Sequence, residues 1–135
     1  MVGTFNGNPI AMAAIKSTLT IMNEESYNHI SRLSSLLKQK CEEIIKKYNV
    51  PAHVQTIGAK GCLSFVPNPI VHYRNFKENS RWELTDLLWY YLFNNGVYMT
   101  PGGDDEFTLS IQHTEKDIDS FVRAFEKMIL DIIKD

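Results

Sequence analysis

At 135 residues the chain has the length of one domain, and its 44% hydrophobic and 22% charged residues are ordinary for a globular protein. No apolar run approaches the roughly 20 residues of a membrane span, and the formal net charge of -2 would attract neither nucleic acid nor an anionic membrane. Cys41 and Cys62 lie far apart and form no CxxC motif. We therefore expect a cytoplasmic protein with reduced, buried thiols, and a disulfide is the less favoured reading.

The stretch GTFNGNPIAMAA, residues 3–14, joins a glycine-rich loop to the start of a helix. Asn8 is a good N-cap and Pro9 suits the first helical position, so this pattern predicts a helix that runs to about Met22. Its small alanine side chains indicate close packing against another surface. We therefore expect this helix to need a partner surface.

The rest of the chain alternates between helical and strand patterns. Apolar residues recur at three- and four-residue steps in the helical segments, and the two glycines 58 and 61 join a predicted hairpin. Thr114-x-x-Asp117 resembles a capping box with Asp in place of the usual Glu. After the first helix we expect a helix over 26–48, strands over 62–66 and 53–57, a loop over 68–80, a helix over 81–94, strands over 97–100 and 107–112, and a last helix after Thr114.

This order predicts an α+β fold, an antiparallel-rich sheet with helices on one side. Residues 26–135 supply all the strands and the amphipathic helices of such a domain. Residues 1–25 precede it and have the character of a piece of a different domain. We therefore expect two parts, divided near residue 25.

Few residues outside the first loop indicate chemistry. The four histidines, at positions 29, 53, 72 and 113, lack metal-ligand spacing, and no metal site is predicted. His113 has no obvious Ser or Cys nucleophile beside it, so a structural role is favoured. Lys60 stands in a glycine-flanked turn and is expected to be exposed rather than imine-forming. The acids of the PGGDDE turn could bind a cation or face a substrate, although solvated acids are the more common case.

Gly3 and Thr4 are the residues that best fit an anion. They offer an unhindered backbone N–H and a hydroxyl, which are phosphate donors, and the following helix N-terminus adds a favourable dipole. Many glycine-rich helix entries bind nothing, so these residues alone give only a weak indication.

Two motifs resemble a known family. GTFNGNPIAMAA is similar to the stretch that follows the catalytic lysine region in class III pyridoxal-phosphate aminotransferases, and most similar to their glutamate-1-semialdehyde 2,1-aminomutase branch. NNGVYMTPGGDDEFTLSIQHTEKDID resembles the same branch, in the same order. The resemblance covers nearly the whole chain and is strong at its two ends.

The resemblance implies a role for each part of the chain. Gly3 and Thr4 would bind the cofactor phosphate held by the neighbouring subunit of a homodimer, and Asp105 is the nearest match to a carboxylate near the substrate mouth. Residues 26–135 would be the small C-terminal domain of a fold-type I enzyme. Residues 1–25, with the first helix, would belong to the large domain and the dimer interface.

The family's Schiff-base lysine, the aspartate on the pyridine nitrogen and most phosphate ligands lie upstream of the Gly-Thr pair. The resemblance therefore predicts no catalytic residue here, no stable pyridoxal phosphate on this chain alone, and no activity without its missing part. The complete parent would convert glutamate 1-semialdehyde to 5-aminolevulinate, or transfer an amino group to a keto acceptor. A free-standing α+β binding or regulatory module without catalysis is the alternative.

Overall fold

The computed structural model describes residue 3, residues 5–100 and residues 106–134. Five helices and a three-stranded sheet are formed within these residues. In chain order the elements are α1 (Pro9–Ile21), α2 (Glu24–Tyr48), β1 (His53–Ile57), β2 (Lys60–Ser64), α3 (Tyr73–Asn79), α4 (Trp82–Asn94), β3 (Glu106–Thr108) and α5 (Glu115–Lys134). This arrangement confirms the predicted α+β class.

The sheet has the order β1-β2-β3, and both strand pairs are antiparallel. A two-residue turn joins β1 to β2, with Ile57 opposite Lys60 and Gly58 at a positive φ of 55°. Gly61 lies inside β2, where an added Cβ would come within 2.3 Å of the Phe107 ring. Residue 61 must therefore be a glycine, because β2 pairs with β3 at this position and the Phe107 ring occupies the space of a side chain.

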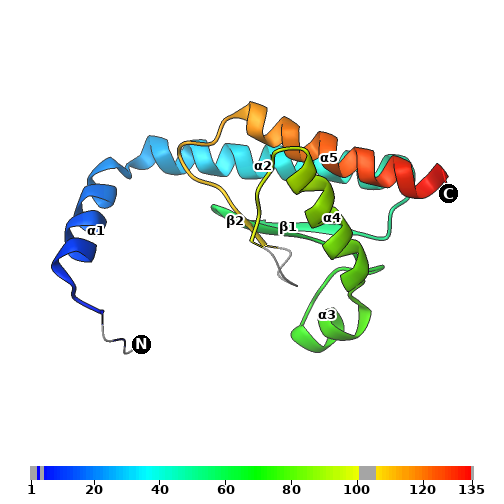
Figure 1. Cartoon of the computed structure of the whole chain (residues 1–135), viewed down its shortest axis with the longest axis horizontal. Coiled ribbons are helices and arrows are strands. Elements are labelled where there is room, and N and C mark those ends of the chain that lie inside the picture. The colour runs from blue at the N-terminus through cyan, green and yellow to red at the C-terminus, as the bar shows by residue number, and fades with distance from the viewer. Residues whose placement is uncertain (1–2, 4, 101–105, 135) are drawn as a thin grey trace.

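Helices cover one face of this sheet (Figure 1). α2 and α5 run side by side above the strands, and α4 packs against α5. The core between them is apolar, and its largest fully buried side chains include Phe65, Phe125, Leu33, Leu37 and Leu63. On the opposite face of the sheet Gln55 and Ile57 are exposed, so the sheet is covered on one side, as predicted.

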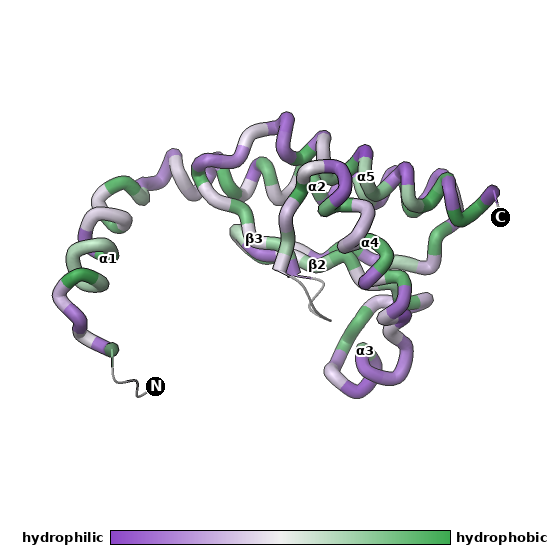
Figure 2. Tube along the Cα trace, viewed as in Figure 1, coloured by the Kyte–Doolittle hydropathy of each residue, from purple (hydrophilic) through white to green (hydrophobic). Residues whose placement is uncertain are grey.

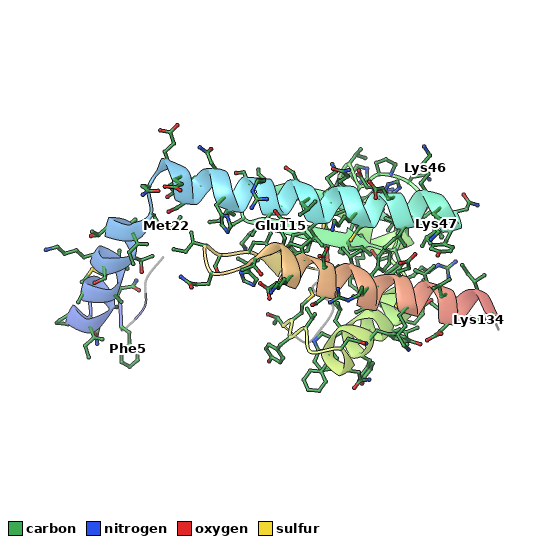
Figure 3. The ribbon with its side chains drawn as sticks, turned by 90° about the horizontal axis from the view of Figure 1, so that it is seen from above. Phe5, Met22, Lys46, Lys47, Glu115 and Lys134 are labelled. Atoms are coloured by element: carbon green, nitrogen blue, oxygen red, sulfur yellow. The ribbon has the colours of Figure 1, made fainter. Side chains whose placement is uncertain are left out.

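α1 stands apart from this body. Figures 1 and 3 show it beyond the N-terminal end of α2, with the bend at Met22 and with Phe5 at the far end. No residue of α1 is buried, and green apolar positions along it face no other element in Figure 2. Met22, the C-cap of α1, is half-buried and packs against the core. The predicted need of α1 for a partner surface is therefore unmet within the described residues.

Local chemistry explains where the helices begin and end. The Asn8 side chain accepts hydrogen bonds from two backbone N–H groups of the first turn of α1, and Pro9 occupies its first position. At the start of α5 the Asp117 carboxylate accepts from the Thr114 N–H at 2.7 Å and from its hydroxyl at 2.9 Å, as in the predicted capping box. α2 is longer than expected by two residues because Asn23, not a later residue, is its N-cap.

Four predicted segments differ from the structure. Residues 97–100 form no strand, because the Val97 N–H donates to Leu92 O and the Met99 carbonyl accepts from Trp89, which turns the segment toward α4. β3 ends at Thr108 instead of 112, because the chain turns at Ser110. The expected loop 68–80 contains the short helix α3, and β2 starts two residues earlier than expected.

Candidate functional site

The loop before α1 consists of two successive turns. The Asn6 N–H donates to Gly3 O at 3.1 Å, and the Asn8 N–H donates to Phe5 O at 3.2 Å. A Cβ on Gly3 would lie 3.3 Å from the Asn6 side-chain oxygen, so a larger residue there would push against that side chain. The loop is exposed and residues 3–8 carry no charged side chain, so no carboxylate of the loop would repel an anion.

The start of α1 offers fewer anion donors than the sequence indicates. Pro9 has no N–H, and the N–H groups of Ile10 and Ala11 already donate to Asn8 Oδ1 at 2.9 and 3.4 Å. The Met12 N–H donates to Asn8 O. The helix dipole still favours an anion, but direct donors must come from the loop itself. Thr4 lies outside the described residues, so its phosphate role stays a prediction.

A second feature is a cavity of about 380 Å³ between residues 96–100, β3 and the beginning of α5. Its lining is mixed, with apolar residues such as Leu37 and Phe121 and polar residues such as Thr100, Glu106 and Ser120. A concave site that combines apolar and polar lining residues can receive a small molecule. Asp105 lies outside the described residues, so its proposed place beside a substrate is untested.

His113 and Ser110 form a tight turn on the cavity wall. His113 Nδ1 accepts the Ser110 backbone N–H at 3.0 Å and lies 2.9 Å from the Ser110 hydroxyl oxygen. The expectation that no serine lies beside His113 was therefore wrong, because the turn folds residue 110 back onto it. Both groups that contact Nδ1 come from one residue three positions away, which is the geometry of a turn. The pair thus serves the structural role predicted for His113.

Asp117 is the charged group of the cavity wall with a shifted pKa. Hydrogen bonds from the backbone N–H and the hydroxyl of Thr114 hold the pKa of Asp117 below its usual value. The carboxylate therefore stays ionised and committed to capping α5, and it cannot serve as a proton donor at neutral pH.

The other histidines are scattered, as predicted. His29 Nε2 lies 2.9 Å from His113 O and links α2 to the turn, whereas His72 Nδ1 accepts the Asn75 N–H and caps α3. Among the described residues no group of three His, Cys, Asp or Glu side chains could hold a metal ion. Cys41 and Cys62 are not joined in a disulfide.

No lysine of the chain has the surroundings of an imine-forming lysine. All ten lysines lie within the described residues, and none is buried. Lys60 lies 3.4 Å from Glu106 and its side chain is 62% exposed, which confirms the predicted exposure. A lysine that forms an imine at neutral pH requires a lowered pKa, through desolvation or a neighbouring cation. Lys60 has neither, because its neighbour is a carboxylate.

Trp89 is a residue that the sequence analysis missed. Its indole N–H donates to the Met99 carbonyl at 2.9 Å, and its ring stacks on Phe93 with centroids 5.2 Å apart. Residues 97–100 form one wall of the cavity, so α4 reaches the cavity through this bond. Only the spacing of aromatic residues on α4 could have indicated it, and that pattern is equally typical of a core face.

A comparison with known families identifies the family of the chain that carries these features. A sequence model of the family described as aminotransferase class-III matches residues 1–129. The chain belongs to this family. The match includes α1 and its loop, so the separate position of α1 is not a reason to assign it to an unrelated protein.

Curated relatives of this class-III aminotransferase chain are glutamate-1-semialdehyde 2,1-aminomutases. It is 29% identical over 131 residues to glutamate-1-semialdehyde 2,1-aminomutase 2 of Staphylococcus saprophyticus, and 31% identical over 133 residues to an aminomutase of Ruminiclostridium cellulolyticum. Each alignment covers 97% of this chain and 30% of the relative. The chain thus spans about 30% of the length of these relatives.

Solved structures confirm the fold. A glutamate-1-semialdehyde aminomutase from Pseudomonas aeruginosa PAO1 superposes with a TM-score of 0.83 at 21% identity, over 96% of this chain and 30% of that one. An omega-transaminase from Sphaerobacter thermophilus gives a TM-score of 0.77 at 20% identity, over 97% of this chain and 30% of that one. These neighbours confirm the predicted fold, that of fold-type I aminotransferases.

Proposed function

We propose that this chain forms the C-terminal part of a glutamate-1-semialdehyde 2,1-aminomutase. The observation that carries the proposal is the 29–31% identity to curated aminomutases over 97% of the chain. The complete enzyme would consist of this chain and a large domain, in one polypeptide or as a second chain. It would act as a homodimer on glutamate 1-semialdehyde. The cytoplasmic location expected from the sequence remains a prediction, and among the described residues no helix is long and apolar enough to cross a membrane.

The loop before α1 fits the phosphate of pyridoxal phosphate by its donor chemistry. Its described residues carry no charge, and Gly3 precedes Thr4 in the sequence, so that a backbone N–H and a hydroxyl are available as phosphate donors. Pyridoxal phosphate, when bound, supplies the electron sink for moving an amino group. Gly3 and Thr4 would hold its phosphate in the neighbouring subunit.

The proposed division of the chain follows from burial. α1 buries no side chain against residues 24–134, whereas α2, α4 and α5 share one core. We propose that the part before residue 26 packs with the large domain at the dimer interface and that the remainder is the small domain.

The substrate would meet the cavity between residues 96–100, β3 and α5. Its mixed apolar and polar lining suits a small amino acid derivative. Asp105 precedes Glu106, which lines the cavity, in the sequence. The Asp105 carboxylate is therefore the group that we propose at the substrate mouth.

The first test is the reaction of the complete enzyme. We expect it to convert glutamate 1-semialdehyde to 5-aminolevulinate without an external amino donor. A strict requirement for a second amino acid or keto acid would instead identify a transaminase. The 135-residue chain alone should be inactive, and borohydride treatment with pyridoxal phosphate should fix no cofactor stoichiometrically on one lysine.

The second test concerns Thr4. Thr4→Ala in the complete enzyme should weaken cofactor retention by about 1.5–3 kcal/mol, the usual value of a hydrogen bond to a charged group. Equilibrium dialysis of the cofactor measures this change. Thr20→Ala is the matched control, because the Thr20 hydroxyl donates only to Lys16 O on α1. Equal cofactor affinity in both variants would contradict the phosphate role.

A further inference from the structure

The cavity wall formed by residues 97–100 has little backbone support of its own. It forms no strand, and within the described residues Val97 N–H to Leu92 O is its backbone hydrogen bond to α4. Tyr98 is 74% exposed. A wall without a ladder of strand hydrogen bonds needs another restraint if the cavity is to keep one shape.

Trp89 supplies such a restraint from α4. The indole N–H donates to Met99 O at 2.9 Å, two residues beyond Val97. The N–H of tryptophan is a donor only, so the bond fixes both the ring and the carbonyl that it reaches. The wall is thus held at residue 97 through the backbone and at residue 99 through a side chain.

Neighbouring aromatic rings hold Trp89 in place. Phe93, one helical turn away, stacks on it with an interplanar angle of 15°, and Tyr90 meets it edge-on at 5.3 Å. Tyr98, on the wall itself, meets the Phe93 ring edge-on at 6.3 Å. We name these four residues the α4 aromatic cluster. Because its rings restrain one another, the indole N–H is aimed before any ligand arrives.

We propose that Trp89 is a positioning residue for the substrate cavity, acting through Met99 on the wall formed by residues 97–100. The proposal rests on the proposed function, since it assumes that this cavity receives the substrate. A shift of the wall by about 1 Å would misplace a bound substrate relative to groups supplied by the rest of the enzyme. The role is one of geometry, because Trp89 itself does not line the cavity.

The test is Trp89→Phe in the complete enzyme, which keeps an aromatic ring and removes the N–H. We expect KM for glutamate 1-semialdehyde to rise about three- to tenfold, the effect of losing one ordinary hydrogen bond, with kcat changed less. Trp82→Phe is the matched control, because Trp82 meets Phe76 edge-on at 5.3 Å and does not line the cavity. Phe93→Leu removes the stacking ring and should also raise KM, by a smaller factor than Trp89→Phe.

A second readout uses the 135-residue chain. Trp89→Phe should accelerate hydrogen exchange of the Val97 amide by about tenfold, whereas Trp82→Phe should leave it unchanged. An unchanged KM in Trp89→Phe, or a loss of active enzyme without a change in KM, would overturn the positioning role. If the wild-type complete enzyme moves no amino group, the proposed function is wrong, and Trp89 then positions no substrate. The Val97 exchange then still decides whether Trp89 holds the wall.

Discussion

α1 and the body formed by residues 24–134 differ in how far their apolar side chains are buried. In the body, α2 and α5 bury one apolar face each against a common core. In α1, Ile15 and Leu19 are 50% and 64% exposed and no residue is buried. Both parts have well-capped helices, so local sequence explains the helices but not their different exposure.

The difference fits the proposal that α1 packs against a large domain outside residues 24–134. An isolated helix of this length is marginal in water, and most helical stability in proteins comes from packing an apolar face. The body already satisfies its own core without α1. The proposed large domain and neighbouring subunit of the homodimer would supply a covering surface for α1.

The largest expected contrast is between two leucines. Leu33→Ala, at a fully buried site of α2, should lower the free energy of unfolding of the chain by about 2–5 kcal/mol. Leu19→Ala on α1 is the same substitution at an exposed site and should change it by less than about 0.5 kcal/mol. Urea denaturation measures both. A similar loss in both variants would show that α1 is part of the cooperative unit and would remove the contrast.

A smaller contrast is expected between two helix caps. Asp117→Asn should lower the melting temperature of the body at neutral pH, because a carboxylate that accepts two bonds from Thr114 is lost. Asn8→Ala should leave it unchanged, since Asn8 caps only α1. Thermal denaturation followed by circular dichroism compares the two variants.

The Asp117 effect should depend on pH. Its pKa in the folded protein is lower than in the unfolded chain, so its stabilisation is complete above the unfolded pKa and disappears as the pH falls through the folded pKa. The difference in melting temperature between wild type and Asp117→Asn should therefore shrink in acid. A difference that stays constant from neutral to acidic pH would argue against the capping carboxylate.

The smallest contrast lies within the body. Burial, with a smaller contribution from Glu42, raises the pKa of the Cys41 thiol to about 12, whereas Cys62 is only half-buried in β2. At mildly alkaline pH a thiol reagent should modify Cys62 first and reach Cys41 only when the chain unfolds. Mass spectrometry of the labelled peptides distinguishes the two sites. Equal labelling rates in the native chain would contradict the buried position of Cys41.

Sequence patterns predicted the helices best, because caps and apolar periodicity are local. Asn8-Pro9 and Thr114-x-x-Asp117 placed the starts of α1 and α5 correctly. The strands were less predictable. Residues 97–100 have strand composition, but the bond from Trp89 to Met99 turns them toward α4, and no local pattern contains that contact.

The candidate site was predictable only through resemblance. Gly3 and Thr4 have suitable donors, but the predicted N-cap Asn8 accepts the N–H groups of Ile10 and Ala11, which are therefore not free for an anion. The cavity joins segments from α2, residues 96–100, β3 and α5, and this depends on tertiary packing. The Ser110–His113 contact was missed because it depends on a turn in a segment expected to be a strand.

Hydrogen exchange of the α1 backbone amides measures whether α1 is uncovered in this chain and covered in the complete enzyme. We expect the amides of residues 12–21 to exchange rapidly in the monomeric 135-residue chain, while the amides in the buried parts of α2 and α5 exchange slowly. In the complete enzyme the same α1 amides should become protected, because the large domain and the neighbouring subunit cover them. Strong protection of α1 in the isolated monomer, equal to that of α2, would show that α1 is already covered within this chain.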